Sequence, residues 1–208
     1  MPIITQIVSQ VKNLDRASLF VDGDFRCGIS KLVVGTFRLK VGQEISEQDI
    51  ERYIFESDKD KAFAYALNYV TRYSPTERQL TRKLYDKKFC KSIVDFVVAK
   101  CKEYGYINDL EYARCYVNYN KDLKGKIKIK SDLMQKGIQQ DIIAEVLEDM
   151  PTSDGAFVLA QKHSKNEDIF DRKYQAKLAR YLAGKGYEWT KISDCLQRLK
   201  EQQENCDD

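Results

Sequence analysis

Apolar and polar positions recur along this chain in a fixed order. The segment Ser74–Phe89 predicts a helix, because Leu80 and Leu84 lie one turn apart on one face of it. The same apolar pattern returns at Ile129–Ile138 and again at Leu178–Tyr187, each time 49 residues further along the chain. A fixed period of this kind is typical of repeat architectures. We therefore expect three copies of one helical unit.

Two capping patterns predict where helices begin. Ser74, Pro75 and Glu77 form an S-x-x-E capping box with proline in the first turn, so we expect Ser74 to cap the first of the repeated helices. The segment Ser46-Glu-Gln-Asp49 is a second capping box and predicts a helix that runs to about Phe55.

Each copy is predicted to hold three short helices. In the first copy, one helix begins near Asp60, the Ser74 helix follows, and a third helix starts after Phe89. The buried face of the third helix recurs in the later copies at the same offset. Its positions are Val94, Val97, Val98 and Cys101, then Ile143, Val146, Leu147 and Met150, then Ile192, Cys195, Leu196 and Leu199.

Residues 1–29 have the pattern of strands. They are rich in β-branched residues, and Asp22-Gly23 between two apolar runs is a strong hairpin signal. Residues 31–37 fit either a short helix or another strand, and Gly42 predicts a turn.

The predicted fold is mainly α, with three tandem three-helix repeats forming an elongated curved array behind a small N-terminal β-hairpin element. We expect 1–58 to be the N-terminal β-containing element with a linking helix. Repeat 1 is then 59–107, repeat 2 is 108–152 and repeat 3 is 153–208. A long repeated surface suits an extended partner better than a small molecule.

Composition narrows the class of protein. Of the 208 residues, 43% are apolar and 32% are charged, which is typical of a soluble chain with a charged surface. The net charge of +3 is too small to indicate a partner, but its distribution is uneven. Residues 59–150 hold 18 basic and 13 acidic side chains, so the positive charge falls on the first two repeats.

The cysteines and the apolar runs indicate a cytoplasmic protein. The six cysteines include no C-x-x-C pair, and the first fifteen residues lack the basic start and apolar run of a signal peptide. No apolar stretch is long enough to cross a bilayer, so we expect no membrane partner.

No motif indicates catalysis. The chain has neither a phosphate-binding glycine loop of the G-x-x-x-x-G-K-[ST] type nor a G-x-G-x-x-G fingerprint, and its carboxylates are scattered. The single histidine, His163, has no cysteine near it in sequence and is expected at the surface. We expect no enzyme, no metal site and no cofactor. A hydrolase remains an alternative only if His163 is catalytic.

An ordered series of motifs gives a family resemblance. The series comprises Ala66-Leu67, Ser74-Pro-Thr-Glu-Arg-Gln-Leu-Thr-Arg-Lys-Leu84, Lys88-Phe89, Tyr104-Gly-Tyr-Ile-Asn-Asp109, Tyr112-Ala113, Ile129, Leu133 and Lys136-Gly137-Ile138. Over roughly residues 59–200 the chain resembles the RecX family of regulatory proteins, and the N-terminal hairpin is consistent with it. It departs from the family pattern at Lys88, where a glycine is usual, and at Asn108, where an acidic residue is common.

The resemblance implies three three-helix units that lie along the groove of a RecA–DNA filament. It implies a non-catalytic regulator that binds the recombinase filament and modulates it, with inhibition expected, in recombination, repair and the SOS response. Some members also touch DNA, so single- or double-stranded DNA is a second candidate partner. We expect the chain to act as a monomer.

Two basic clusters are the candidate contact sites, because cations neutralise phosphates or an acidic groove. The residues expected to contact RecA or DNA are Arg72, Arg78, Arg82, Lys83, Lys87, Lys88, Lys124, Lys126, Lys128, Lys130, Lys136 and Lys185. The alternative is that these residues form solvated helix faces. For Lys87, Lys136 and Lys185, which share one position in the three copies, the preferred interpretation is a lysine that complements the helix dipole.

The aromatic residues are expected to be structural. Tyr65, Tyr69 and Tyr73 recur as Tyr112, Tyr116 and Tyr119, and packing is favoured over base stacking. Trp189 is predicted to anchor the last helix. The alternative function is a direct DNA-binding module that acts without recombinase, since three-helix units with a basic helix can enter a major groove.

Overall fold

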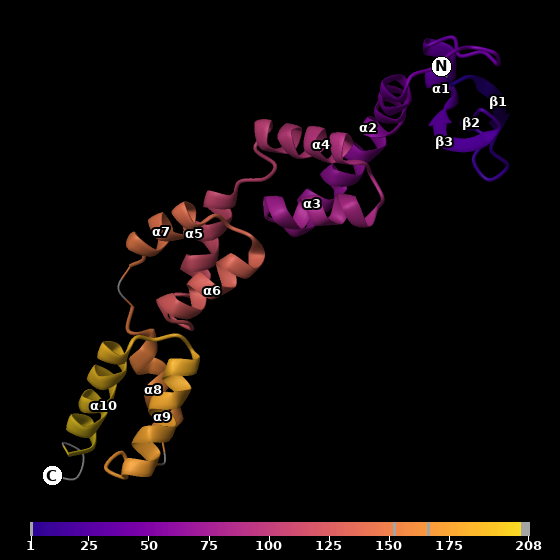
Figure 1. The fold of residues 1–208 in the computed structure, drawn as a ribbon. Coiled ribbons are helices and arrows are strands. Elements are labelled where there is room, and N and C mark those ends of the chain that lie inside the picture. The colour runs from indigo at the N-terminus through magenta and orange to yellow at the C-terminus, as the bar shows by residue number, and fades with distance from the viewer. Residues whose placement is uncertain (1, 152, 166, 205–208) are drawn as a thin grey trace. The chain divides into compact units, whose positions relative to one another are not determined.

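The computed structural model describes residues 2–151, 153–165 and 167–204 (Figure 1). The described residues form three strands and ten helices. The strands are β1 (Ile4–Ser9), β2 (Arg16–Val21) and β3 (Asp24–Ser30). The helices are α1 (Lys31–Thr36), α2 (Glu47–Tyr73), α3 (Glu77–Asp86), α4 (Lys91–Glu103), α5 (Asp109–Asn120), α6 (Lys126–Lys136), α7 (Gln140–Glu148), α8 (Gly155–Ser164), α9 (Arg172–Gly184) and α10 (Trp189–Glu204). The mainly α prediction with a small N-terminal sheet is confirmed.

The chain divides into two compact units. The first comprises residues up to Pro75 together with Gln79–Ile107, and the second comprises Thr76–Arg78 and the chain from Asn108 onward. The first unit therefore holds the sheet and most of α2–α4, and the second holds α5–α10 with the start of α3.

The N-terminal element is a three-stranded antiparallel sheet in the order β1-β2-β3. The predicted hairpin is its β2–β3 part. Asp22 and Gly23 form the two-residue turn with φ values of 49° and 93°, as the Asp-Gly pair requires. β1 adds a third strand, which the hairpin prediction did not include. Residues 31–36, left open between helix and strand, are helix α1, capped by the Ser30 side chain.

Helix α2 is one continuous helix of 27 residues. The capping box at Ser46 and Asp49 is confirmed, but the predicted end at Phe55 and new start near Asp60 are wrong. The intervening residues include no glycine or proline, so nothing in the backbone stops the helix. Its middle instead holds the sheet, because Ser57 accepts a hydrogen bond from Ser30 N at 2.8 Å and Asp58 pairs with Arg16. The predicted domain boundary after residue 58 thus falls inside α2.

Ser74 ends a helix and does not begin one. It is the C-cap of α2, with a left-handed φ of 40°, and α3 starts only at Glu77. The predicted role of Ser74 as N-cap of the following helix is therefore wrong. The same short polar side chain that favours an N-cap also tolerates the left-handed conformation, so the sequence pattern fitted both ends.

Each set of three helices has its own buried cluster. Leu80 and Leu84 of α3 are fully buried against α2 and α4. Ile129 and Leu133 of α6 do the same among α5–α7, and Leu178 and Leu182 of α9 among α8–α10. The third-helix columns read from the sequence are buried, except that Leu147, Met150 and Leu196 are half-buried.

Within the second unit, α6 begins against the loop that follows α9. Gly125 N donates to Lys185 O at 2.9 Å, and Ile127 N donates to Gly186 O at 3.2 Å. A Cβ on Gly125 would collide with the backbone of Gly186, so this close approach requires glycine. The carbonyls at the end of α9 thereby satisfy N–H groups at the start of α6, which both helices would otherwise leave unbonded.

The corresponding loop after α6 meets residues 76–78 of the same unit. Thr76 Oγ1 donates to Lys136 O at 2.8 Å, and a Cβ on Gly137 would collide with the Arg78 side chain. The second copy of this arrangement lies 49 residues later, at Gly125 and Lys185. The 49-residue period of the sequence therefore matches a repeat in how these loops pack.

Candidate binding surface

Helix α3 carries half of the first basic cluster, which we define as Arg72, Arg78, Arg82, Lys83, Lys87 and Lys88. Burial of Leu80 and Leu84 fixes the orientation of α3 and leaves the charged face of this helix outward. All six basic residues are exposed. Arg78 and Arg82 thus lie on the exposed side of α3, away from the buried Leu80 and Leu84.

Most cations of the first basic cluster form no ion pair with another described residue. Lys83 Nζ lies 3.8 Å from Asp86, and Lys87 Nζ lies 5.3 Å from the centre of the Tyr65 ring. The other members form no ion pair with any residue of the described ranges 2–151, 153–165 and 167–204. They are Arg72, Arg78, Arg82 and Lys88. An exposed, unpaired guanidinium is suited to bidentate contact with phosphate or carboxylate.

The second basic cluster, which we define as Lys124, Lys126, Lys128, Lys130 and Lys136, is largely engaged internally. Lys124 Nζ lies 2.9 Å from Asp132 and 2.9 Å from the Tyr116 hydroxyl, which itself donates to Asp132. Lys128 Nζ also reaches Asp132, at 3.4 Å. Lys124 therefore joins α5 to α6 and is a structural residue in this arrangement.

The charges of this network shift the pKa values of its members. Burial disfavours the ionised carboxylate of Asp132, but hydrogen bonds from Lys124 and Tyr116 outweigh it and lower the pKa. The hydrogen bond to Asp132, followed by that to Tyr116, raises the pKa of Lys124. Both groups are thus charged at neutral pH. Lys126 and Lys130 are exposed and form no ion pair with another described residue.

The three lysines that share one repeat position each lie over a tyrosine ring. Lys87 Nζ is 5.3 Å from the centre of Tyr65, Lys136 Nζ is 5.3 Å from Tyr116, and Lys185 Nζ is 5.5 Å from Tyr181. These are cation–π distances. The sequence suggested a helix-dipole role, and it gave no sign of this second one, because the tyrosines lie on other helices or in other turns.

Two predictions about single aromatic residues are wrong. Trp189 does not anchor α10, since its side chain is 69% exposed, and the buried role falls to the neighbouring Tyr187. His163 is half-buried: its Nδ1 lies 3.0 Å from the Tyr174 hydroxyl and its ring packs on Tyr181. Both predictions depended on which face of the helix is buried.

Among the described residues, no group of three or more His, Cys, Asp or Glu side chains is placed to hold a metal ion. Three of the five described cysteines, Cys27, Cys101 and Cys195, are buried thiols whose pKa is raised by burial. No helix in the described ranges is both long enough and apolar enough to span a bilayer. Cys206 lies outside the described residues.

Comparison with known proteins identifies the family. Residues 2–46 match the RecX N-terminal domain, and residues 108–147 match the second three-helix domain of RecX. The regulatory protein RecX of Clostridioides difficile (strain 630) is 34% identical over 206 residues, which cover 96% of each chain. The chain belongs to the RecX family. The RecX protein of Clostridium tetani (strain Massachusetts / E88) is 31% identical, with 94% of each chain covered.

Solved RecX structures agree with this fold. A crystal structure of regulatory protein RecX matches with a TM-score of 0.62 and 26% identity, covering 93% of this chain and 100% of that one. RecX from Lactobacillus salivarius matches with the same TM-score, covering 69% of this chain and 97% of that one. The RecX N-terminal domain corresponds to the sheet and α1, and the second RecX domain corresponds to α5–α7.

Proposed function

We propose that this chain is a non-catalytic regulator that binds a RecA-type recombinase filament on DNA and restrains its activity. The observation that carries the proposal is the exposed first basic cluster, whose Arg72, Arg78, Arg82 and Lys88 form no ion pair with a described residue. Membership of the RecX family supports the choice of partner. Its site of action is the cytoplasm, where DNA and recombinase meet.

The mechanism is electrostatic and steric. Unpaired cations on α3 contact phosphates or carboxylates of the filament, and the bulk of the helical sets then obstructs other partners of the filament. Each DNA phosphate neutralised adds roughly 0.9 to the slope of log affinity against log salt for duplex DNA. The paired Lys124 contributes little to this slope, because it would first have to leave Asp132.

The test is a titration of the full chain into RecA bound to single-stranded DNA, with ATPase rate and filament length as readouts. We expect both to fall with added protein. The double variant Arg72→Glu, Arg82→Glu should weaken the effect at least about tenfold, since hydrogen bonds to charged groups contribute roughly 1.5–3 kcal/mol each. Reversal of an exposed lysine on α2 outside the cluster, Lys61→Glu, is the matched control and should leave the effect intact. No change in ATPase or filament length with excess protein would contradict the proposal.

Direct DNA binding without recombinase is the alternative, favoured by the same unpaired arginines. A mobility-shift titration with duplex DNA across salt concentrations separates the two. Tight, sequence-selective binding to DNA alone would support the alternative, whereas weak binding that vanishes at moderate salt would support the filament as the partner.

A further inference from the structure

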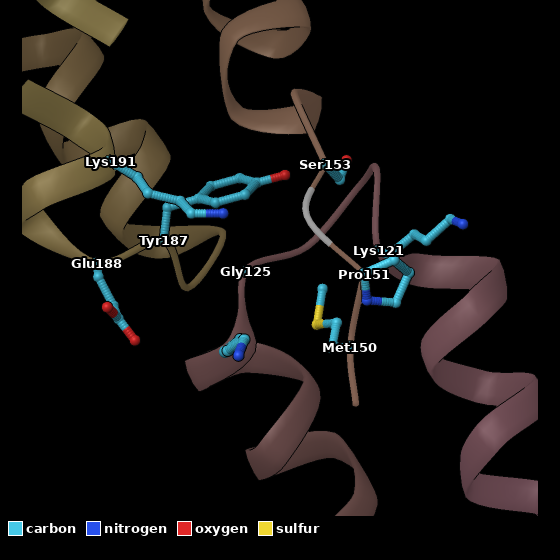
Figure 2. A pocket seen from close by; sticks show the side chains of 9 residues that line it. Lys121, Gly125, Met150, Pro151, Ser153, Tyr187, Glu188 and Lys191 are labelled. Carbon is cyan, nitrogen blue, oxygen red and sulfur yellow. The ribbon is translucent and has the colours of Figure 1, made fainter. Parts of the chain in front are cut away.

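A cavity of about 260 Å³ lies within the second unit, where α6 begins and the α9–α10 loop passes (Figure 2). A single water needs only roughly 10–15 Å³ of such space, so the cavity can hold a larger group. Its lining residues are Lys121, Gly125, Lys126, Met150, Pro151, Ser153, Tyr187, Glu188 and Lys191. Three lysines therefore line the cavity, against one glutamate, Glu188.

The hydroxyl of Tyr187 has no hydrogen-bond partner among the described residues. Tyr187 is only 6% exposed, so its hydroxyl is largely removed from bulk solvent. Figure 2 shows the ring extending into the cavity, with its hydroxyl directed to the side on which Ser153 lies. A buried hydroxyl without a hydrogen-bond partner is destabilising, and a ligand that accepts a hydrogen bond from it would recover that cost.

The repeat pattern shows that packing does not require this hydroxyl. The equivalent positions in the earlier copies are Phe89 and Ile138, which are purely apolar. Ile138 fills its place in the core of α5–α7 as Tyr187 does in the core of α8–α10. Tyr187 therefore brings a polar atom to a position where its counterparts have none.

The electrostatic surroundings of the hydroxyl favour an anion. Lys121, Lys126 and Lys191 form no ion pair with a residue of the described segments. The nearby Asp122 carboxylate accepts a hydrogen bond from Ser153. Burial, and secondarily Asp122, raise the pKa of Tyr187 to about 12, so it remains an O–H donor.

We propose that this cavity is an oxyanion site that binds a phosphate group, with the Tyr187 hydroxyl as donor and Lys121, Lys126 and Lys191 as counter-charges. Free phosphate and a phosphodiester of a nucleic-acid backbone share the chemistry that this site recognises. The site is independent of the first basic cluster, so it stands whether or not the chain restrains a recombinase.

The test compares thermal unfolding of the full chain in inorganic phosphate and in chloride at equal ionic strength and pH. We expect phosphate to raise the wild-type Tm by about 2–4 °C at saturation. Tyr187→Phe, which restores the residue type of Phe89, should lose most of this rise. Its Tm in chloride should equal or exceed that of the wild type, because the unsatisfied hydroxyl is gone, and this excludes misfolding as the cause.

Matched variants outside the cavity complete the design. Tyr181→Phe removes a hydroxyl from α9 and Lys200→Gln removes a charge from α10, and both should keep the phosphate effect. Lys191→Gln, on the same helix as Lys200, should reduce it. A wild-type Tm that responds equally to phosphate and chloride, or a Tyr187→Phe variant that keeps the full response, would overturn the proposal.

A short single-stranded oligothymidylate distinguishes the two sources of phosphate. If Tyr187→Phe weakens its binding severalfold together with the response to inorganic phosphate, the site takes a backbone phosphodiester. If only the inorganic phosphate response is lost, the site takes the free ion.

Discussion

Helices α3 and α6 occupy the same place in successive three-helix sets, yet they treat their charges in opposite ways. Lys83 of α3 and Asp132 of α6 share one repeat position, 49 residues apart. Asp132 binds Lys124 and Lys128 in one network, whereas Lys83 and the other basic residues of α3 are exposed to solvent. The carboxylate of Asp132 together with its two lysine partners therefore distinguishes α6 from α3.

A second difference lies at the loop that follows each of these helices. Lys88 and Gly137 both adopt a left-handed conformation, with φ values of 66° and 88°. Gly137 also needs the absence of a side chain, because it packs against Arg78, while Lys88 is exposed. A lysine at the position that is glycine in the later copies therefore bears the cost of the left-handed conformation. Because the Lys88 side chain is exposed, it does not collide with a packed neighbour.

Exchanging the residue at the packed loop should have the largest effect on stability. Gly137→Lys should lower the free energy of unfolding by about 3 kcal/mol, because left-handed strain of roughly 1–2 kcal/mol adds to the collision with Arg78. Urea unfolding measures this. Gly184→Ala, at a helical glycine with open space, is the control and should be neutral or slightly stabilising. A loss no larger than about 1 kcal/mol would mean that the loop packs loosely.

The second-largest effect on stability is expected when the charge of Asp132, which binds Lys124 and Lys128, is removed. Asp132→Asn should cost about 2 kcal/mol, because Lys124, Lys128 and Tyr116 lose a charged acceptor. Asp95→Asn, at an exposed position of α4, is the control and should change stability little. Equal effects of the two substitutions would show that the network contributes nothing.

The difference in stability between wild type and Asp132→Asn should also depend on pH. The folded-state pKa of Asp132 lies below its unfolded value of about 3.9. Its contribution is therefore present above that unfolded value and is lost as the pH falls through the folded pKa. The difference between wild type and Asp132→Asn should be full at neutral pH and shrink below about pH 4, measured by urea unfolding at each pH.

Relieving the backbone strain at Lys88 should raise stability, by less than the preceding substitutions lower it. Lys88→Gly should raise the free energy of unfolding by about 1 kcal/mol, since glycine adopts the left-handed conformation without a steric cost. Lys88→Ala keeps the strain while removing the charge, so it should show no gain. An equal gain in both variants would assign the effect to charge.

The smallest effect on stability is expected when Lys83 of α3 is replaced by the aspartate that α6 has at the same repeat position. Lys83→Asp should change stability by less than about 0.5 kcal/mol, because the positions that would supply its lysine partners are Pro75 and Gln79. Thermal unfolding compared with Lys83→Ala measures this. A clear stabilisation by Lys83→Asp would show that other cations can close a network on α3.

Periodicity alone predicted most of the fold, because the apolar columns that define it are local in sequence. The Asp22-Gly23 turn was predicted correctly, since it depends on one backbone conformation. The continuity of α2 was missed, because hydrogen bonds from the sheet reach Ser57 and Asp58 across long sequence distances.

The candidate surface was harder to predict than the fold. Counting lysines found both basic clusters, but it could not show that Lys124 is paired. Lys124 lies in the loop between α5 and α6, and its partners Tyr116 and Asp132 lie on those two helices. The unsatisfied Tyr187 hydroxyl had a sequence signal, namely a tyrosine where the other copies have Phe89 and Ile138. Only the burial of Tyr187 made that difference informative.

The way α6 is capped has a consequence for how the second unit can be divided. The first N–H groups of α6 are satisfied by Lys185 and Gly186, which lie beyond α9. The start of α9 is satisfied by its own Asp171, which accepts from Lys173 N. A fragment that ends after α7 would thus carry an α6 whose first turn lacks these backbone hydrogen-bond partners. The first turn of α6 therefore depends on Lys185 and Gly186, which are synthesised only after α6 itself.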